Sequence, residues 1–492
     1  MSRTVPSPMS RNTSSPMSLT SDPATARTTN AFPHFTDGDV DLILTTTRRY
    51  KLHSTVLRRH STLFASLLAP HHAVQLSRRA LRNGVTVRYR LELRAQSQSP
   101  SSSSSSYNNN DGNGSESAFA RAPLDSEGRA VQGEGSVIVE ENGNGRVPGS
   151  GSAQVYSWYE KVLGAFYLVE VRLGPEGGGG TMAEVLEDAW GLVGVAERVG
   201  CVASISKSVD NALLSEGPTL HRSVTSNPLA WLNLALLLHS RAIFKEAVIH
   251  IVGNYNVHLS TPPPASFLAA HPHSLTTLDQ LDPYVRGLVE TKVRTLKGMC
   301  RTVDRTLMTW YPANLSRELV TGRADRDNIG RSSYQSDIMT WMALALFRHW
   351  LGQTIAADGT HHAADGGFAF YSQIARGGDA YLNREVVAGF HERFPMSRKG
   401  MSVVAGALEG FKVGVKGAVE PLLRSWSKAE TGRWPVAWLT CVEVGNEECP
   451  WEKDAAKEKG KGRGKGKRKR EEYEEEDGGD GMARSETVET VE

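Results

Sequence analysis

The chain has 492 residues, of which 39% are hydrophobic and 22% are charged, with 47 glycines and 22 prolines. This length exceeds that of one compact domain, and the low apolar fraction predicts that part of the chain stays outside any packed core. With 56 Lys and Arg against 54 Asp and Glu, the formal net charge of +2 lacks the chain-wide basic field of a dedicated nucleic-acid binder, so we expect no nucleic-acid partner.

Cysteine usage argues against a disulfide-rich protein, and hydropathy argues against a membrane-spanning one. The four cysteines, Cys201, Cys300, Cys441 and Cys449, form no C-x-x-C pair and are too scattered for a disulfide scaffold. They therefore favour a reducing compartment and argue against a cysteine-rich zinc site. The strongest apolar run, Leu229 to Leu238, has about half of the roughly 20 residues that a membrane-spanning helix needs, so we expect no membrane segment.

Three segments have the composition of unstructured chain. They are an N-terminal tail over residues 1–30, a low-complexity insert over 95–153 and a charged tail over 452–492. Each contains too few apolar side chains to offset the entropy lost on ordering. The C-terminal tail opens with a Lys- and Gly-rich run, 457–470, and then becomes acidic over 471–477.

Between the N-terminal tail and the insert, the pattern predicts a small unit of strands and helix. Asp39 to Leu44 and Arg49 to His53 indicate two strands joined by a turn. Leu52 to Leu68 has apolar residues at helical spacing, which predicts one amphipathic helix. Val85 to Leu93 alternates strictly between apolar and polar residues, as a half-buried strand does.

After the insert, the apolar spacing predicts helices throughout. Asn227-Pro228 has the form of a helix start, with Asn as the N-cap and Pro in the first turn. The predicted helices are Trp158 to Tyr167, Met182 to Val199, Ile205 to Leu214, Pro228 to Ala235, Ala242 to Val252, Asp282 to Met308, Ser336 to Ile355 and Val403 to Val415.

A family resemblance rests on the first strands and helix. This part of the chain resembles the opening of a BTB (POZ) domain, whose pattern is D-V-x-φ-x-φ, a turn, φ-x-φ-H-[KR]-x-φ-L, then S and F, with φ apolar. The residues that carry the resemblance are Asp39 to Leu44, Tyr50 to Leu57 after a turn, Ser61 and Phe64. Beyond the insert, residues 165–173 are similar to the later family element F-x-Y-T-G-x-V-x-L, and the stripe over 185–199 matches its paired C-terminal helices. Residues 227–252 resemble the helical extension of fungal BTB-domain proteins of unassigned function.

The resemblance implies an α+β fold class, with a BTB/POZ-like small mixed sheet and helices, interrupted by the disordered insert and followed by an all-α region. Residues 31–94 and 154–216 would form the BTB/POZ-like domain, 217–310 a helical extension and 311–451 a further helical region. The residues that it assigns to the domain framework are Asp39, His53, Val56, Leu57, Ser61, Phe64, Tyr167 and Val171.

One departure from the family pattern bears on function. In family members that recruit co-repressors, a Lys or Arg after the histidine and the preceding aspartate, here Asp39, line a charged pocket. Here the residue after His53 is Ser54, so the pocket lacks its cation.

No motif indicates catalysis, a cofactor or a metal. Asp37, Asp39 and Asp41 alternate as calcium ligands do, but the loop lacks the turn glycine and the bidentate glutamate of an EF-hand, so we interpret them as a polar strand entry with one capping carboxylate. We interpret His53 as a buried structural hydrogen-bonding residue rather than a base. His361-His362 has no carboxylate or cysteine at ligand spacing. We therefore predict that the protein is not an enzyme.

The basic run in the C-terminal tail is a candidate nuclear import signal. Its cations are Lys465, Lys467, Arg468, Lys469 and Arg470. The alternatives are a solvated charged tail and a weak, sequence-blind nucleic-acid contact. The run favours the nucleus over the cytoplasm.

We therefore predict a non-catalytic protein-interaction module, of the scaffold or adaptor type that the BTB resemblance implies. Its partners would be proteins that the sequence does not identify, with self-association and cullin binding as the options that the family offers. One alternative is a substrate adaptor of a cullin-type ubiquitin ligase, although no kelch or other substrate-binding repeat is visible. A second alternative is a transcription cofactor.

Overall fold

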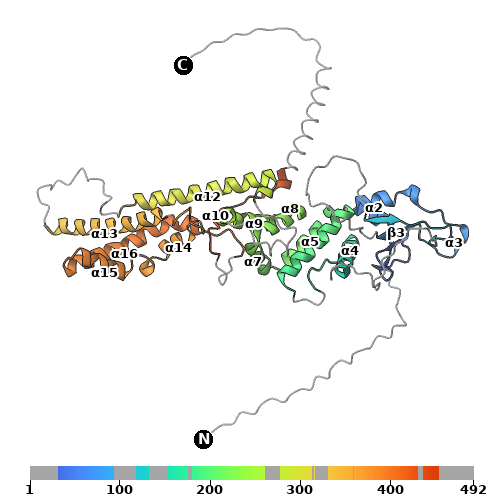
Figure 1. The fold of residues 1–492 in the computed structure, drawn as a ribbon, viewed down its shortest axis with the longest axis horizontal. Coiled ribbons are helices and arrows are strands. Elements are labelled where there is room, and N and C mark those ends of the chain that lie inside the picture. The colour runs from blue at the N-terminus through green and yellow to red at the C-terminus, as the bar shows by residue number, and fades with distance from the viewer. Residues whose placement is uncertain are drawn as a thin grey trace, which may run out of the picture. The chain divides into compact units, whose positions relative to one another are not determined.

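The computed structural model describes residues 31–93, 118–131, 152–175, 180–260, 278–312, 315, 331–357, 359–429 and 436–453. The chain divides into two compact units, Met1–Ser152 and Ala153–Glu492. The first holds a four-stranded sheet and the second is helical, so the expected mixed α and β content is confirmed (Figure 1). The 1–30 tail and most of the 452–492 tail lie outside the described residues.

The sheet of the first unit has the strand order β2-β1-β3-β4. β1 (Val40–Ile43) and β2 (Arg49–Leu52) form the predicted antiparallel hairpin, with Val40 opposite Leu52. β3 (Tyr89–Leu93) runs parallel to β1 and is shorter than predicted. Its expected first residues instead follow the short helix α3 (Arg78–Arg82), because the Val85 amide donates to the Ala80 carbonyl.

The expected single helix over Leu52 to Leu68 is wrong, because the chain breaks at Ser61. α1 (Ser54–His60) ends there, and α2 (Thr62–Leu67) begins with Ser61 as its N-cap. Ser61 has an extended backbone, and its Oγ accepts from the Phe64 amide at 3.0 Å. Apolar spacing continues across the break, so periodicity alone does not reveal it, whereas serine is a favoured N-cap residue. The turn η1 (Pro70–His72) follows α2.

The insert over 95–153 is not wholly unstructured, which corrects the prediction. Residues 118–131 are ordered, and β4 (Phe119–Arg121) pairs antiparallel with β3. Phe119 is fully buried, with its ring 5.4 Å from that of Phe64. This single aromatic side chain supplies the burial that the surrounding low-complexity sequence lacks.

In the second unit, the regular elements of the described chain are all helices. The elements are α4 (Ser152–Phe166), α5 (Met182–Val199), α6 (Val202–Ser215), α7 (Pro218–Ser226), α8 (Pro228–Leu238), α9 (Arg241–Gly253), α10 (Tyr255–Ser260), η2 (Leu278–Gln280), α12 (Pro283–Thr309), α13 (Arg331–Ala356), α14 (Phe368–Arg376), η4 (Gly378–Ala380), α15 (Arg384–Arg393), α16 (Arg398–Leu423) and η5 (Asn446–Glu448). Each predicted helix is present, and α8 begins at Asn227-Pro228 as expected. The short helices α7, α10, α14 and α15 are not among the predictions.

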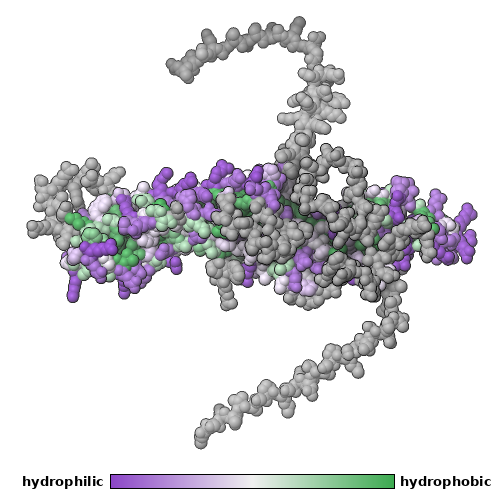
Figure 2. Space-filling model, viewed as in Figure 1, coloured by the Kyte–Doolittle hydropathy of each residue, from purple (hydrophilic) through white to green (hydrophobic). Residues whose placement is uncertain are grey.

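The long helix α12 joins two parts of this unit, because it packs on both α9 and α16 (Figure 1). Its buried stripe includes Val285, Val293, Cys300 and Leu307. Its opposite face is hydrophilic, as Figure 2 shows along its length. No helix among the described residues is both long and apolar enough to cross a membrane.

The grouping of residues 154–216 differs from the prediction, which placed them in one domain with 31–94. The two units divide between Ser152 and Ala153. α5 packs on α6 and α7, and α6 packs on α8. Residues 154–216 therefore belong with the helices that follow them.

Candidate protein-interaction surface

The predicted framework residues of the first unit serve its fold. Leu57 and Phe64 are fully buried, and Val56 is half-buried. The Asp39 carboxylate accepts from the amide and the hydroxyl of Ser54, each at 2.6 Å, and so caps the start of α1. This matches the expected capping carboxylate.

The remaining predicted residues are dispersed. His53 is half-buried rather than buried, and its Nε2 lies 3.2 Å from the exposed Asp37 carboxylate, which corrects the expectation of a core hydrogen bond. Tyr167 and Val171 belong to the second unit, where Tyr167 is half-buried and Val171 is buried. The cations of the basic run, residues 465–470, lie outside the described residues.

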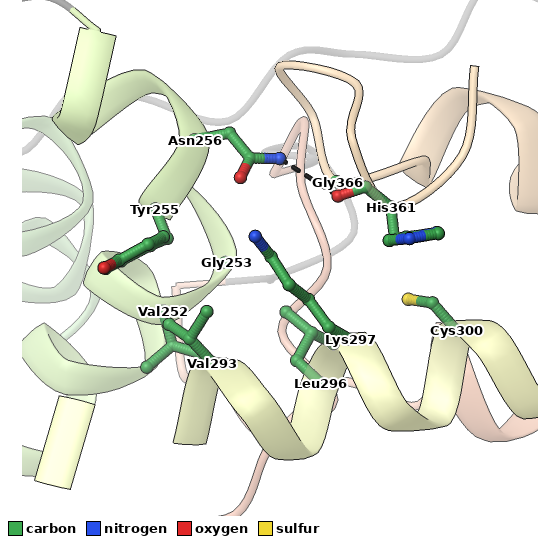
Figure 3. Close-up of a pocket in the computed structure, with 10 residues that line it drawn as sticks. All are labelled: Val252, Gly253, Tyr255, Asn256, Val293, Leu296, Lys297, Cys300, His361 and Gly366. Carbon is green, nitrogen blue, oxygen red and sulfur yellow. Dashed lines mark hydrogen bonds between the residues drawn. The ribbon is translucent and has the colours of Figure 1, made fainter. Parts of the chain in front are cut away.

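A small pocket beside α12 contains residues of catalytic type. Lys297 extends from α12 between Tyr255 and Asn256, and His361 lies opposite Cys300 (Figure 3). Its cavity volume is about 10 Å³, which is room for one water molecule, whereas small-molecule sites measure about 300–1,000 Å³. Burial raises the pKa of the Cys300 thiol to about 12, so this thiol is protonated and unreactive at neutral pH.

A second buried cluster contains Ser427, His250 and Glu246, the residue types of a hydrolase triad. Trp438 Nε1 donates to His250 Nδ1 at 3.2 Å, so the ring proton lies on Nε2. Nε2 faces both Ser427 Oγ and Glu246 Oε1, each at 3.1 Å. A triad needs serine and carboxylate on opposite ring nitrogens, with the nitrogen facing serine unprotonated. This arrangement therefore cannot activate Ser427.

The cluster instead holds the end of the described chain, residues 424–429 and 436–453, which we call the C-terminal strap. Glu246 Oε1 accepts from Ser427 Oγ at 2.6 Å and from the Lys428 and Ala429 amides at 3.0 and 3.2 Å. Burial by itself would raise the pKa of Glu246, but hydrogen bonds from His250, Ser427 and Lys428 outweigh it, so the pKa is lower than that of an ordinary glutamate. Its charge is thus used to fix the strap on α9.

Near residue 310, aromatic side chains form a core between α13 and α16. The Trp310 ring lies 6.5 Å from that of Phe347 and 5.4 Å from that of Phe411. Gly414 permits this approach, since a Cβ there would lie 2.4 Å from the Trp310 ring. Trp310, which directly follows α12, is therefore anchored in this core.

Outside this core, neighbouring apolar side chains remain exposed to solvent. We call Tyr311, Ile338 and Trp341 the Trp341 patch; their exposed fractions are 39%, 39% and 48%. Tyr311 and Trp341 meet edge to face at 6.0 Å. The Arg348 guanidinium lies 4.2 Å from the Tyr311 ring centroid and donates to the Trp310 carbonyl at 3.3 Å. The patch is thus exposed, and Arg348 holds its Tyr311 ring in place.

A second exposed apolar surface lies on α15, none of whose residues is buried. We call Val386, Phe390 and Phe394 the α15 patch. Val386 is 47% exposed and Phe394 53%, and the two phenylalanine rings lie 5.0 Å apart. Figure 2 shows hydrophobic side chains among hydrophilic ones over α13, α15 and α16.

The loop that leads into α15 is fixed by a buried lysine. Lys412, on α16, is 2% exposed, and its Nζ donates to the carbonyls of Gly378 and Leu382 at 2.6 and 3.2 Å. Leu382 has a positive φ of 44°. Buried ammonium groups need such partners, so Lys412 fixes the loop that precedes the N-cap of α15.

Comparison with known families locates a domain over these helices. Residues 312–421 match the family model of the FF domain, which is a protein–protein interaction module. No curated protein and no solved structure matches the chain. The match covers α13 to α16, which carry most of the Trp341 patch and all of the α15 patch.

The match corrects the family assignment made from the sequence. The family found is the FF domain and not BTB/POZ, and no BTB family model matches. The residues that suggested BTB are those that many strand–turn–strand–helix units share, namely alternating apolar residues followed by a helix start. That pattern is present in the first unit, but it does not specify a family.

Sequence reasoning missed both patches. Trp341 lies in a predicted helix, but an exposed tryptophan has the same sequence signature as a buried one. Asn383 before Arg384 to Arg393 was an available signal for α15, because its side chain caps the helix by accepting from the Val386 amide at 3.1 Å.

Proposed function

We propose that this protein is a non-catalytic protein-interaction protein, and that its FF-matching region binds a partner protein with the Trp341 patch as anchor. The observation that carries the proposal is the exposed Trp341 ring, held against Tyr311 within a region whose family mediates protein interactions. Tryptophan, tyrosine and arginine are the residues most enriched among those that dominate binding energy.

The contacts behind the patch favour binding. Arg348 bonds to the Trp310 carbonyl and stacks on Tyr311, while Trp310 is locked between Phe347 and Phe411. A side chain already held in one geometry loses less conformational entropy on association. The α15 patch, which the Lys412 contacts position, would extend the interface.

The non-catalytic part of the proposal rests on the two residue clusters of catalytic type. The pocket at Cys300 admits one water molecule, and the Ser427 cluster has its carboxylate on the wrong nitrogen. Among the residues that the structure describes, no group of three or more His, Cys, Asp or Glu side chains could hold a metal ion.

The cullin-adaptor alternative depended on the BTB resemblance and has no support now that the resemblance is overturned. The transcription-cofactor alternative and nuclear import depend on the basic run at 465–470, and they stay predictions from composition.

The test is affinity purification of the intact protein beside three single variants, with co-purifying proteins quantified by mass spectrometry. Trp341→Ala removes the anchor, Phe394→Ala removes part of the α15 patch, and Glu420→Ala is the control on the exposed side of α16. Circular dichroism establishes that each variant keeps its helical content.

We expect Trp341→Ala to reduce recovery of at least one protein about tenfold or more, as loss of an interface hot spot does. Phe394→Ala should reduce it less, and Glu420→Ala should leave it unchanged. Equal recovery of every protein with Trp341→Ala and with Glu420→Ala would refute the anchor.

A further inference from the structure

A groove in the first unit has no role in the function proposed above. It lies between the end of α2 with η1 and the strands β3 and β4, and its volume is about 590 Å³. We call it the arginine groove and define it by Leu67, His72, Arg88, Tyr89, Phe119 and Arg121.

The unit around this groove is basic, although the whole chain is not. The described residues 31–93 and 118–131 contain twelve Lys and Arg but six Asp and Glu, a net charge of +6. The whole chain carries only +2. The positive charge is therefore concentrated in this unit, as at surfaces that attract acidic partners.

Within the groove, two guanidinium groups are available. Arg88 and Arg121 are exposed, and neither forms an ion pair with a described residue, whereas Arg90 beside them is paired with Asp41 and Glu92. His72 lines the same groove as Arg121, and desolvation and then the charge of Arg121 lower the pKa of this histidine. The groove thus presents positive charge that the described part of the unit does not neutralise.

The apolar residues of the groove favour a peptide over a nucleic acid. Phe119 is fully buried and Tyr89 is 8% exposed, so neither ring offers a face on which a base could stack. Leu67 and Val74 line the same groove and can contact apolar side chains. β4 is also the last strand of the described sheet, and an extended peptide can pair with such an edge.

We propose that the arginine groove binds an acidic, partly apolar segment of a partner protein. Carboxylates of the segment would pair with Arg88 and Arg121, because a guanidinium binds a carboxylate through two parallel hydrogen bonds. Its apolar side chains would lie against Leu67 and Val74. This surface is separate from the Trp341 patch, so either proposal can fail without the other.

The test measures binding of a fluorescein-labelled peptide of alternating Glu and Leu to the full-length protein by fluorescence anisotropy. Arg88→Gln/Arg121→Gln removes the two groove cations. Arg78→Gln/Arg79→Gln is the matched control, since it removes the same charge from exposed positions on α3 outside the groove. The basic run in the C-terminal tail is identical in both variants, so the difference between them isolates the groove.

We expect the groove variant to weaken peptide binding about tenfold or more, and the α3 variant about twofold or less, because paired charges contribute far more than distant ones. A peptide with Gln in place of Glu should bind neither variant nor the unaltered protein. If the double variant does not fold, Arg121→Gln alone provides the same comparison.

Three results would overturn the proposal. One is equal weakening of peptide binding by the two variants, which would indicate attraction by the overall positive charge of the unit and not by the groove. Another is failure of the Glu-Leu peptide to bind the unaltered protein. The third is tighter binding of a single-stranded oligonucleotide of the same charge, lost in the groove variant, which would assign the groove to nucleic acid.

Discussion

The two units of this protein expose different chemistry. In the first unit, short strands bury their apolar side chains, and the groove presents Arg88 and Arg121. In the second, long helices bury several aromatic rings, such as Phe347 and Phe411, but leave Trp341 and Phe394 at the surface. Charge attracts from a distance and is screened by salt, whereas apolar contact acts at short range. The comparison teaches that one chain can display two surfaces suited to partners of different composition.

The units also differ in what maintains them. The first depends on the Asp39 and Ser61 caps, on the burial of Leu57 and on the pairing of short strands. The second depends on contacts distant in sequence, since Glu246 binds the C-terminal strap and Trp310 fills the space beside Gly414. Substitutions in one unit should therefore leave the other intact.

The largest effect is expected from Leu57→Asp, which places an unpartnered carboxylate in the core of the first unit. We expect a loss of about 3–5 kcal/mol in the free energy of unfolding, the cost of a buried charge without a partner. Hydrogen exchange read by mass spectrometry should show fast exchange in β1 to β3 and unchanged exchange in α8 and α9.

Ala65→Asp, at an exposed position of α2, is the control and should alter exchange little. Unchanged protection of β1 to β3 in Leu57→Asp would remove Leu57 from the core. Parallel loss of protection in α8 and α9 would show that the units are not independent.

A smaller effect is expected from Glu246→Gln, which removes the charge that binds the strap. Glutamine keeps one acceptor oxygen but has an NH2 donor in place of the other, so the strap loses one acceptor and the carboxylate charge, at a cost of about 2 kcal/mol. Burial raises the pKa of Cys441 to about 11 and that of Cys201 to about 12, so both thiols are protected in the folded protein. Labelling of Cys441 by a thiol reagent should therefore accelerate while that of Cys201 stays slow.

The same variant tests a pH dependence. The folded-state pKa of Glu246 is lower than that of an ordinary glutamate, so its carboxylate stabilises the strap fully above the ordinary value, and the stabilisation is lost as the pH falls through the folded-state pKa. Acid should thus open the strap of the unaltered protein, and this step should be absent in Glu246→Gln. Glu443→Gln, which changes an exposed strap carboxylate, should retain it.

The smallest effect distinguishes two glycines of α16. Gly414→Ala would place a Cβ 2.4 Å from the Trp310 ring, whereas the Gly410 position has open space around it. We expect Gly414→Ala to lower the free energy of unfolding by about 1–2 kcal/mol through overpacking. Gly410→Ala should raise it by about 1 kcal/mol, the helix propensity of alanine over glycine.

Urea denaturation followed by tryptophan fluorescence measures both glycine variants. A shift in the same direction for the two would mean that Trp310 does not pack on Gly414. Unequal shifts of opposite sign would confirm that this one contact anchors the segment below the Trp341 patch.

Local patterns predicted much of the fold. The alternation in the first strands and the apolar stripe of Met182 to Val199 gave elements that the structure contains, the latter with the same bounds. The break at Ser61 escaped prediction because apolar spacing continues across it, although the Ser61 cap acts locally on the Phe64 amide. The strand at Phe119 escaped because its burial partner, Phe64, is distant in the sequence. The candidate surface was not predicted, since periodicity does not separate a buried tryptophan from an exposed one.

What the sequence determined by itself is the content of helix and strand, because hydrophobic spacing and cap residues act within a few neighbours. Tertiary structure decided which residues serve which purpose. Glu246 is buried against Ser427, 181 positions away, and its charge therefore stabilises the strap. Trp341 is exposed beside Tyr311, so this aromatic pair is accessible to a partner. Both depend on contacts between distant segments, which local spacing does not encode.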